Sequence, residues 1–176
     1  MITYTETLKL PLAANHLLSH LQSITIQLYK PLVCDYTHSY ELQTLPDFRL
    51  MEGAIVPPHS DGIAGYRPIL MLHNPSNSYT IRGTEQIFSP QRQGTLVILD
   101  IDAQHEVHSK DPNARLGNWS GVVWGLNGQP LLKDEWSVEQ VTAMAKQDFL
   151  KLCETIHGKL KPSNIASTPR NAMAIC

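Results

Sequence analysis

The sequence predicts a mainly β fold, an antiparallel sandwich or barrel, with flanking α-helices. From about residue 32 to 129, short apolar or alternating runs typical of strands are separated by turns rich in Pro, Gly and Asn. Helical periodicity is absent from this stretch, whereas amphipathic helical patterns lie on either side of it. Because no internal repeat or linker is found, residues 1–161 are expected to form one domain, and the polar residues 162–176 a loose tail.

The first helix is predicted over about residues 15–29. Asn15 is expected to cap its N-terminus, and Pro31 to end it. The β-branched residues around Ile24–Ile26 also suit a strand. Apolar residues recur in the helix at steps of three and four: Leu17, Leu21, Ile24 and Leu28.

Several strands are predicted in the central region: Leu50–Val56, Ile69–Leu72, Ser78–Arg82, Thr95–Ile101 and Trp119–Trp124. The turn clusters between them are Pro57–Pro58, Asn74–Asn77, Pro90–Gly94 and Asp111–Asn113. Short strands divided by such turns are typical of a sandwich or barrel, which buries its apolar faces between sheets.

The second helix is predicted over about residues 137–157. Ser137 and Gln140 form a capping-box pattern at its start, and Gly158 is expected to cap its end. One face is apolar, so the helix should pack against the sheet. That face consists of Val138, Val141, Ala145, Phe149, Leu152 and Ile156.

Composition narrows the class of protein. The formal net charge of −2 gives no dominant basic surface, which argues against nucleic-acid or anionic-membrane binding. The longest apolar run, Ala172 to Cys176, has five residues and is too short to span a membrane. The three cysteines are odd in number and widely spaced, as in a reducing compartment. We therefore expect a cytoplasmic protein.

Candidate metal ligands follow two of the predicted strands. In an extended segment, His59 and Asp61 point to the same side, and an imidazole and a carboxylate together make two-thirds of a facial metal site. His105 follows the apolar run that ends at Ile101, and can return to the same cavity in a double sheet. Arg115, ten residues after His105, leads into the next strand and could aim its guanidinium at a carboxylate there.

The order His-x-Asp, then a Gly-Thr-Leu-Val strand leading to His-x-Val, then Arg ten positions on resembles the iron(II)- and 2-oxoglutarate-dependent dioxygenases, in particular their compact prolyl-hydroxylase-like branch. The resemblance covers about residues 49–125. It implies a double-stranded β-helix, or jelly-roll, with a metal site inside one mouth.

By this resemblance, His59, Asp61 and His105 are the iron(II) ligands. Arg115 is implied to hold the distal carboxylate of 2-oxoglutarate, and Tyr66 to offer the cosubstrate a hydroxyl. The implied reaction is hydroxylation of a small molecule, an amino acid or a peptide or protein side chain. It consumes O2, releases succinate and CO2, and is supported by ascorbate.

The spacing of the residues distinguishes between alternative metal ligands. His105 is favoured over His108 because it faces the same way as Val107 and stands ten residues before Arg115. Asp102, His105 and His108, spaced by three, could instead bind zinc on a turn, but the preceding strand and Pro112 argue against a helix there.

Other polar and aromatic residues have simpler interpretations. His73 is interpreted as a strand-end residue, and Trp119 and Trp124 as core. Arg67 and Arg82 lie near strand ends, where a solvated charge is the simpler interpretation, and Arg67 is kept as a candidate for substrate binding.

Two other functions are open from the sequence. A cupin-like metal-dependent isomerase or epimerase would use a similar barrel, but a His-x-His cluster is missing. A non-catalytic β-sandwich that binds a ligand would need no metal at all.

Overall fold

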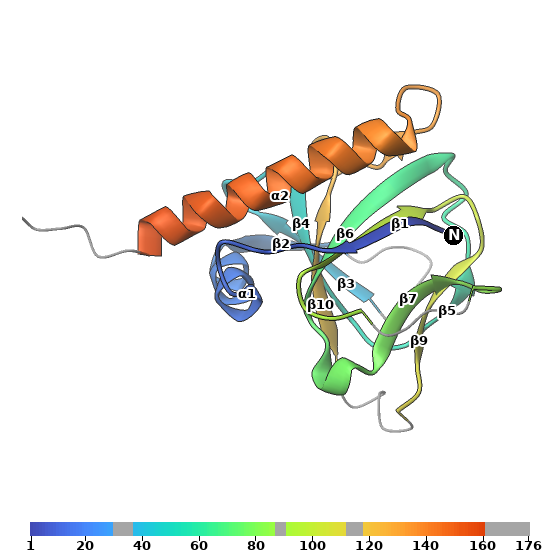
Figure 1. The fold of residues 1–176 in the computed structure, drawn as a ribbon, viewed down its shortest axis with the longest axis horizontal. Helices are drawn as coiled ribbons and strands as arrows, with labels where there is room; N and C mark the ends of the chain where they lie inside the picture. Colours follow the sequence, from blue (N-terminus) through green and yellow to red (C-terminus); the bar gives the residue numbers. More distant parts are fainter. Residues whose placement is uncertain (30–36, 87–90, 112–117, 161–176) are drawn as a thin grey trace, which may run out of the picture.

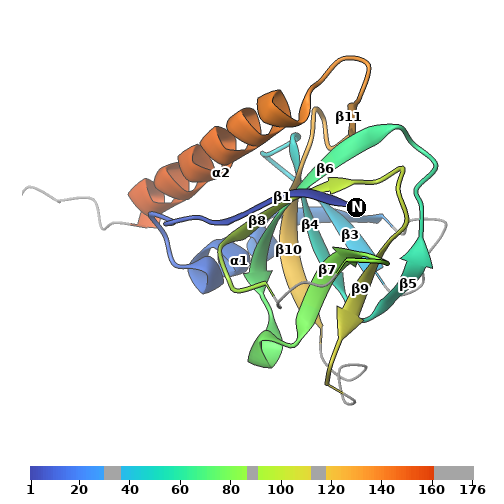
Figure 2. The same ribbon diagram turned by 45° about the vertical axis from the view of Figure 1, so that its right-hand side comes forward.

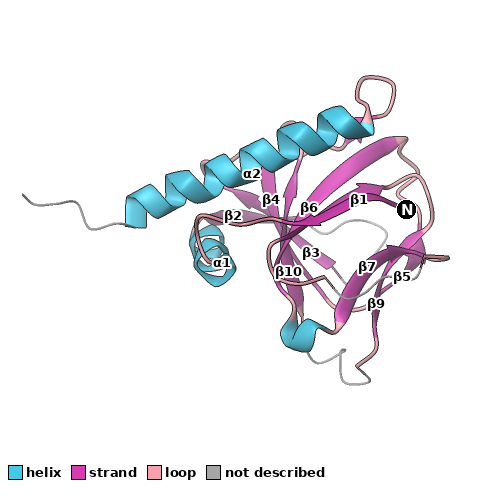
Figure 3. Cartoon of the chain, viewed as in Figure 1, coloured by secondary structure: helices cyan, strands magenta, loops and turns pink. Residues whose placement is uncertain are grey.

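The computed structural model describes residues 1–29, 37–86, 91–111 and 118–160, in which two β-sheets face each other and two helices cover one of them (Figure 1). The helices are α1 (Ala14–Ser23) and α2 (Val138–Leu160), and a short 3-10 turn, η1, spans Pro75–Asn77. The view in Figure 3 shows α1 and α2 on one side of the β structure and the small sheet on the other. The order of layers is helices, large sheet, small sheet.

The large sheet has eight strands in the order β1-β8-β6-β10-β4-β3-β2, with β11 added beside β6. Its strands are β1 (Ile2–Thr7), β2 (Thr25–Tyr29), β3 (Thr37–Leu42), β4 (Phe48–Gly53), β6 (Gly65–His73), β8 (Thr95–Asp100), β10 (Trp119–Trp124) and β11 (Leu131–Leu132). The small sheet has three strands in the order β5-β9-β7, namely β5 (Val56–His59), β9 (His105–Ser109) and β7 (Tyr79–Gly83). Figure 2 shows this small sheet from a second side.

The chain passes from one sheet to the other at every step from β4 to β10. Strands β4, β6, β8 and β10 belong to the large sheet, and β5, β7 and β9 belong to the small one. All strand pairs among the described residues are antiparallel. This alternating winding is that of a jelly-roll, and it confirms the predicted mainly β fold with flanking helices.

Two apolar clusters hold the layers together. One lies between the helices and the large sheet and includes Leu17, Phe149 and Trp124. The other lies between the two sheets and includes Met71 and Trp119. Strand β6 contributes to both, because successive side chains of a strand point to opposite faces. Trp119 and Trp124 are therefore core residues, as predicted.

The two predicted helices had different outcomes. The second is confirmed and begins with the predicted capping box: Gln140 Oε1 accepts from the Ser137 amide at 2.9 Å, and Ser137 Oγ from the Gln140 amide at 3.3 Å. It continues past Gly158 to Leu160, so the predicted cap there is wrong. Since α2 is long but carries many charges, no helix in the described ranges is apolar enough to cross a membrane.

The first helix is shorter than predicted. It ends at Ser23, and the β-branched residues after it form strand β2, so the prediction of helix up to residue 29 is wrong. Ala13 occupies the N-cap position without a side-chain hydrogen bond, and the Asn15 side chain accepts from the amide of the next residue, His16. Pairing of β2 with β3 decided the outcome against local helical periodicity.

Two further features differ from the sequence prediction. Strand β1 was not predicted, although Ile2–Thr7 is rich in β-branched residues; it forms an edge beside β8. Pro57 and Pro58 were expected to form a turn but lie within β5. Strand β5 is an edge strand of the small sheet, where a proline need not donate to a neighbour. His73 ends β6, as predicted.

Candidate metal centre

Three candidate ligands meet at one end of the small sheet. His59 is the last residue of β5 and His105 the first of β9, and the two are register partners. Asp61 follows β5, and its amide donates to the carbonyl of Ile101 at 2.9 Å, which ties this segment to the end of β8. Residues 46 positions apart in the sequence are thus brought together by the winding of the sheets.

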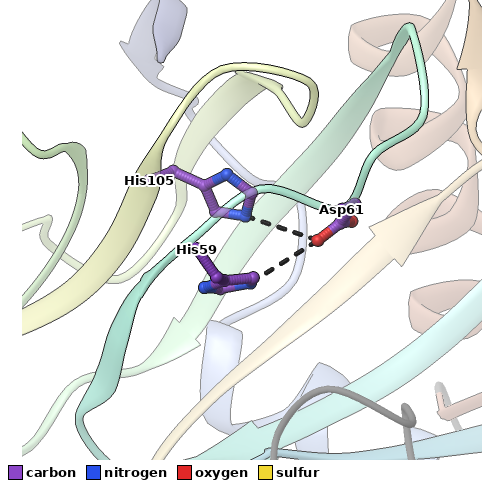
Figure 4. Close-up of side chains that lie close together, drawn as sticks. All are labelled: His59, Asp61 and His105. Carbon is purple, nitrogen blue, oxygen red and sulfur yellow. Dashed lines mark ion pairs between the residues drawn. The ribbon is translucent and has the colours of Figure 1, made fainter.

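The side chains of these residues converge (Figure 4). Asp61 Oδ1 lies 3.5 Å from His59 Nε2 and 3.7 Å from His105 Nε2. The ring centroids of His59 and His105 are 4.3 Å apart, with the ring planes inclined by 53°. One ligand atom from each residue lies within 4.8 Å of the others, which is close enough to share one metal ion.

Backbone carbonyls set the tautomer of both imidazoles. His59 Nδ1 lies 2.9 Å from the carbonyl oxygen of Pro57, and His105 Nδ1 lies 2.9 Å from that of Ala103. A carbonyl only accepts, so each Nδ1 must carry the proton and donate it. When the ring is neutral, Nε2 therefore carries a lone pair that a metal can accept. In both His59 and His105, Nε2 is the ring nitrogen that faces Asp61. Metal-bound histidines are oriented by the same kind of hydrogen bond.

The pKa values respond to burial and to the shared carboxylate. The hydrogen bond with Asp61 raises the pKa of His59, while burial lowers that of His105. Burial acts to raise the pKa of Asp61, but the hydrogen bond with His59 and the charge of Arg67 outweigh it, so that pKa is lowered. Asp61 is consequently ionised at neutral pH, which suits a ligand for a cation.

Arg67 lies next to the candidate ligands. Its Nη2 atom is 3.9 Å from Asp61 Oδ2, the carboxylate oxygen that does not face the histidines. The side chains of Arg67 and Asp61 are 22% and 27% exposed, so the contact is only partly screened by solvent. Arg67 therefore contacts a candidate ligand and is not simply a solvated charge, which was the simpler interpretation of the sequence.

The donor set fits a divalent transition metal. Two imidazole nitrogens and one carboxylate oxygen form the facial triad typical of non-haem iron(II) sites, and leave other coordination positions open. Within the described ranges this is the one group of three such residues that could hold an ion. Asp102 and His108 are not part of it, so the alternative zinc cluster is not formed.

A cavity of about 370 Å³ opens beside the three residues, between the two sheets. One side is apolar and consists of Val56, Ile69, Ile81, Leu99, Ile101 and Val107. Arg49, Arg67 and Glu41 also line it, from the large sheet. Mostly apolar walls with a few polar groups are typical of small-molecule sites.

The other predicted cosubstrate ligands have different outcomes. Tyr66 packs in the layer between the large sheet and the helices, where Lys133 Nζ lies 5.8 Å from its ring centroid. Because Tyr66 precedes Arg67 on β6, it points to the opposite face, so the structure does not place its hydroxyl at the site. Arg115 lies outside the described residues. Arg82 bonds Glu106 at 2.7 Å and is not among the lining residues.

Sequence reasoning missed the polar residues of the cavity that come from β3 and β4. Ser39, Glu41 and Arg49 all line it. The alternation in Thr37–Leu42, with polar residues at every second position, was a signal that could have revealed them.

Comparisons with known proteins give no family. No protein-family model matches the chain, and no curated protein matches its sequence. The crystal structure of the Drosophila melanogaster CENP-C cumin domain is similar at 9% identity and a TM-score of 0.37, covering 64% of this chain and 95% of that one. The crystal structure of Drosophila melanogaster CENP-C bound to CAL1 is similar at 13% identity and a TM-score of 0.38, covering 64% and 94%. At these scores the likeness is weak, and neither the fold nor the site described above depends on it.

Proposed function

We propose that the protein is an iron(II)- and 2-oxoglutarate-dependent dioxygenase that hydroxylates its substrate. The observation that carries the proposal is the convergence of His59, Asp61 and His105 at a cavity between two sheets. In both histidines Nδ1 is held by a backbone carbonyl and Nε2 faces the Asp61 carboxylate, so the ligand atoms are arranged before any metal binds.

The three side chains would hold the metal. His59 and His105 would each contribute Nε2, and Asp61 one carboxylate oxygen. When bound, iron(II) together with 2-oxoglutarate and O2 supplies the oxidising chemistry that hydroxylates a C–H bond and releases succinate and CO2. The resemblance assigns the distal carboxylate of the cosubstrate to Arg115, and this assignment stays a prediction.

The charges in the cavity support a dianionic cosubstrate. The guanidinium groups of Arg49 and Arg67 are matched by the carboxylates of Glu41 and Asp61, and the carboxylate of Glu106, which also lines the cavity, is matched by Arg82. A divalent cation added to this balanced set leaves excess positive charge in a poorly solvated space. A dicarboxylate such as 2-oxoglutarate neutralises that excess, which favours its binding over that of a neutral molecule.

The apolar wall of the cavity has a second role. Aliphatic side chains from both sheets surround the space next to the candidate ligands. They would limit the access of water to the metal, which would strengthen the electrostatic contacts there and protect reactive species from side reactions. In this proposal the protein contributes the orientation of the reactants and an apolar surface beside them.

Succinate formation from 2-oxoglutarate tests the proposal. The full chain would be assayed with iron(II), ascorbate and a broad panel of candidate substrates, beside His105→Ala and His108→Ala. His108 is three residues along the same strand and is not part of the metal-ligand group, so it is a matched control. We expect succinate from wild type and His108→Ala and none from His105→Ala. Metal binding without consumption of 2-oxoglutarate would contradict the proposal and favour the cupin-like alternative.

A further inference from the structure

The segment that carries His59 and Asp61 contains two residues that cannot donate to a neighbouring strand. Pro57 and Pro58 lie within β5, and a proline has no amide hydrogen. Strand β5 has two register partners in β9, with a shift of register between them: Val56 with Val107, and His59 with His105. Strand pairing therefore gives this segment little support, although it carries two of the three candidate ligands.

The connection between β8 and β9, residues 101–104, binds both segments that carry candidate ligands. Three of its carbonyl groups, successive in the chain, accept hydrogen bonds. That of Ile101 accepts from the Asp61 amide at 2.9 Å, and that of Asp102 from the Ser60 hydroxyl at 2.6 Å. The third accepts from Nδ1 of His105 at 2.9 Å. One short piece of backbone thus orients one ligand ring and holds the segment of the other two ligands.

The Ser60 side chain does not belong to the cavity wall. Ser60 stands between His59 and Asp61, and successive side chains of an extended segment point to opposite sides. Both of its neighbours line the cavity, whereas Ser60 does not. Ser60 therefore acts on the site through the backbone that it holds, and not by touching a molecule bound in the cavity.

The Ser60 hydroxyl makes a second hydrogen bond, within its own segment. Its Oγ accepts from the Gly62 amide at 3.1 Å. A hydroxyl bonded to the amide two residues further on closes a tight turn. Gly62 has a φ of +68°, a left-handed conformation that favours glycine, directly after Asp61. One hydroxyl thus holds both the turn that follows Asp61 and the link to the distant connection.

The group that accepts the Ser60 hydrogen bond is itself held in place. The Asp102 amide donates to Asp100 Oδ1 at 3.2 Å, and Lys133 Nζ lies 2.7 Å from the same oxygen. The Lys133 amide donates to the carbonyl of Ala64 at 2.9 Å, on the far side of the Gly62 turn. Because the connection is anchored in this way, a bond from Ser60 restrains the segment to which Ser60 belongs.

Such a restraint bears directly on metal affinity. An ion binds three ligands only when their donor atoms are close together, and here Asp61 Oδ1 lies 3.5 Å and 3.7 Å from the two histidine Nε2 atoms. A segment that is free to move loses conformational freedom when the ion binds, which lowers the affinity. The Asp61 amide and the Ser60 hydroxyl tie the segment down beforehand. The hydroxyl is the one of these two bonds that a substitution can remove.

We propose that Ser60 is a positioning residue of the candidate metal centre. Its hydroxyl ties the segment of His59 and Asp61 to the connection that orients His105, and so keeps the three ligands in the arrangement that an ion requires. The inference rests on the metal centre of the proposed function but not on the reaction.

Mn²⁺ binding to the full chain tests this role. Competition with a fluorescent chelator would measure the affinity of wild type, Ser60→Ala, Ser60→Thr and Ser60→Val. Thr and Val have the same shape and differ in the hydroxyl alone, so this pair isolates its effect. Ser23→Ala is the matched control, because Ser23 Oγ donates to the His20 carbonyl at the same 2.6 Å, at the end of α1 on the helix side of the large sheet. Urea unfolding with EDTA would measure the stability of each metal-free protein.

We expect Ser60→Ala and Ser60→Val to bind Mn²⁺ about tenfold more weakly than wild type, the lower end of the range for groups that orient metal ligands. Ser60→Thr and Ser23→Ala should stay within about twofold of wild type, since each keeps the Ser60 link. Without metal, Ser60→Ala and Ser23→Ala should lose similar small amounts of stability, because each loses one exposed hydrogen bond. Circular dichroism shows whether each variant is folded, and the Thr–Val pair decides the question if Ser60→Ala is not.

The role of Ser60 would be refuted if Ser60→Ala bound Mn²⁺ as tightly as wild type, or if Ser60→Thr and Ser60→Val lost affinity equally. Either result would leave the proposed dioxygenase untouched. A wild-type protein without affinity for Mn²⁺ would overturn both proposals. Weaker Mn²⁺ binding by Ser60→Val than by Ser60→Thr, in a protein that forms no succinate, would support the role of Ser60 and refute the dioxygenase.

Discussion

His59 and His105 face each other across the pairing of β5 with β9, with their ring centroids 4.3 Å apart. The Nδ1 atom of each ring is held by a backbone carbonyl two residues earlier in the chain. Two of the three candidate ligands are therefore oriented by the sheet itself. Asp61 completes the set from the segment that follows β5, where its amide is bonded to Ile101.

Arg67→Gln should weaken metal binding without abolishing it. The guanidinium lies 3.9 Å from the Asp61 oxygen that faces away from the histidines, so it fixes the orientation of the carboxylate. Loss of a group that orients a ligand typically lowers metal affinity about tenfold to a hundredfold. Competition with a fluorescent chelator would measure the Mn²⁺ affinity. Lys146→Gln removes the ion pair with Glu6, and neither residue lines the cavity, so this variant should leave the affinity unchanged. Equal affinities in all three proteins would refute this role for Arg67.

Gln91→Leu should destabilise the small sheet. The buried Gln91 amide accepts from the Ile81 amide and donates to the Ile81 carbonyl, both at 2.8 Å, in place of a neighbouring strand. Leucine would leave both backbone groups buried and unpaired, at a cost of about 2 to 4 kcal/mol in the free energy of unfolding. Urea denaturation measures this change in the free energy of unfolding, and Gln147→Leu on the exposed face of α2 is the control. A loss no larger than that of the control would show that water replaces the amide.

Ser137→Ala should lower the free energy of unfolding by about 1 kcal/mol. Its hydroxyl accepts from the Gln140 amide at the start of α2. The Gln140 side chain bonds back to the Ser137 amide. The losses of unfolding free energy caused by Ser137→Ala and by Gln140→Ala should therefore not be additive. Thermal or urea unfolding of Ser137→Ala, Gln140→Ala and the double variant would measure this coupling. Strict additivity would contradict a capping box.

Lys133→Met should lower the free energy of unfolding at neutral pH, and it should lower it by a smaller amount at acidic pH. Burial acts to raise the pKa of Asp100, yet the hydrogen bond from Lys133 at 2.7 Å outweighs it, so the pKa is lowered. A lowered carboxyl pKa contributes stability above its unfolded value of about 3.9, and this contribution is lost as the pH falls through the folded pKa. The difference between wild type and Lys133→Met, at most about 1 kcal/mol, should therefore shrink below about pH 4.

Unfolding free energies measured from pH 7 down to pH 2 would show this trend. Lys151→Met, on the exposed face of α2, is the control and should differ little from wild type at any pH. A difference for Lys133→Met that stays constant or grows as the pH falls would rule out this linkage.

The sequence predicted the strands of the jelly-roll where local pattern and tertiary pairing agree. Trp119–Trp124 is buried on both faces and has the bounds that its apolar run indicated. Where local pattern and strand pairing disagreed, strand pairing determined the structure. Ile24 and Leu28 continue a helical periodicity, but the segment from Thr25 forms β2 because it pairs with β3. Strand β1 was missed because an edge strand has no continuous apolar run.

The metal ligands were predictable because their types and order are specific, and β-winding brings distant strand ends together. The orientation of the neighbouring groups was not predictable in the same way. Tyr66 and Arg67 are adjacent, and which of them faces the cavity depends on the register of β6 with β8. Arg49 and Glu41 could be placed together only once β3 and β4 were aligned.

Anaerobic titration with iron(II), followed by 2-oxoglutarate, tests the central claim most directly. The account predicts one tightly bound iron per chain in wild type, a visible charge-transfer absorbance when 2-oxoglutarate is added, and neither signal in His105→Ala. If wild type binds no stoichiometric iron, or if His105→Ala gives the same absorbance as wild type, then His59, Asp61 and His105 do not form the metal centre.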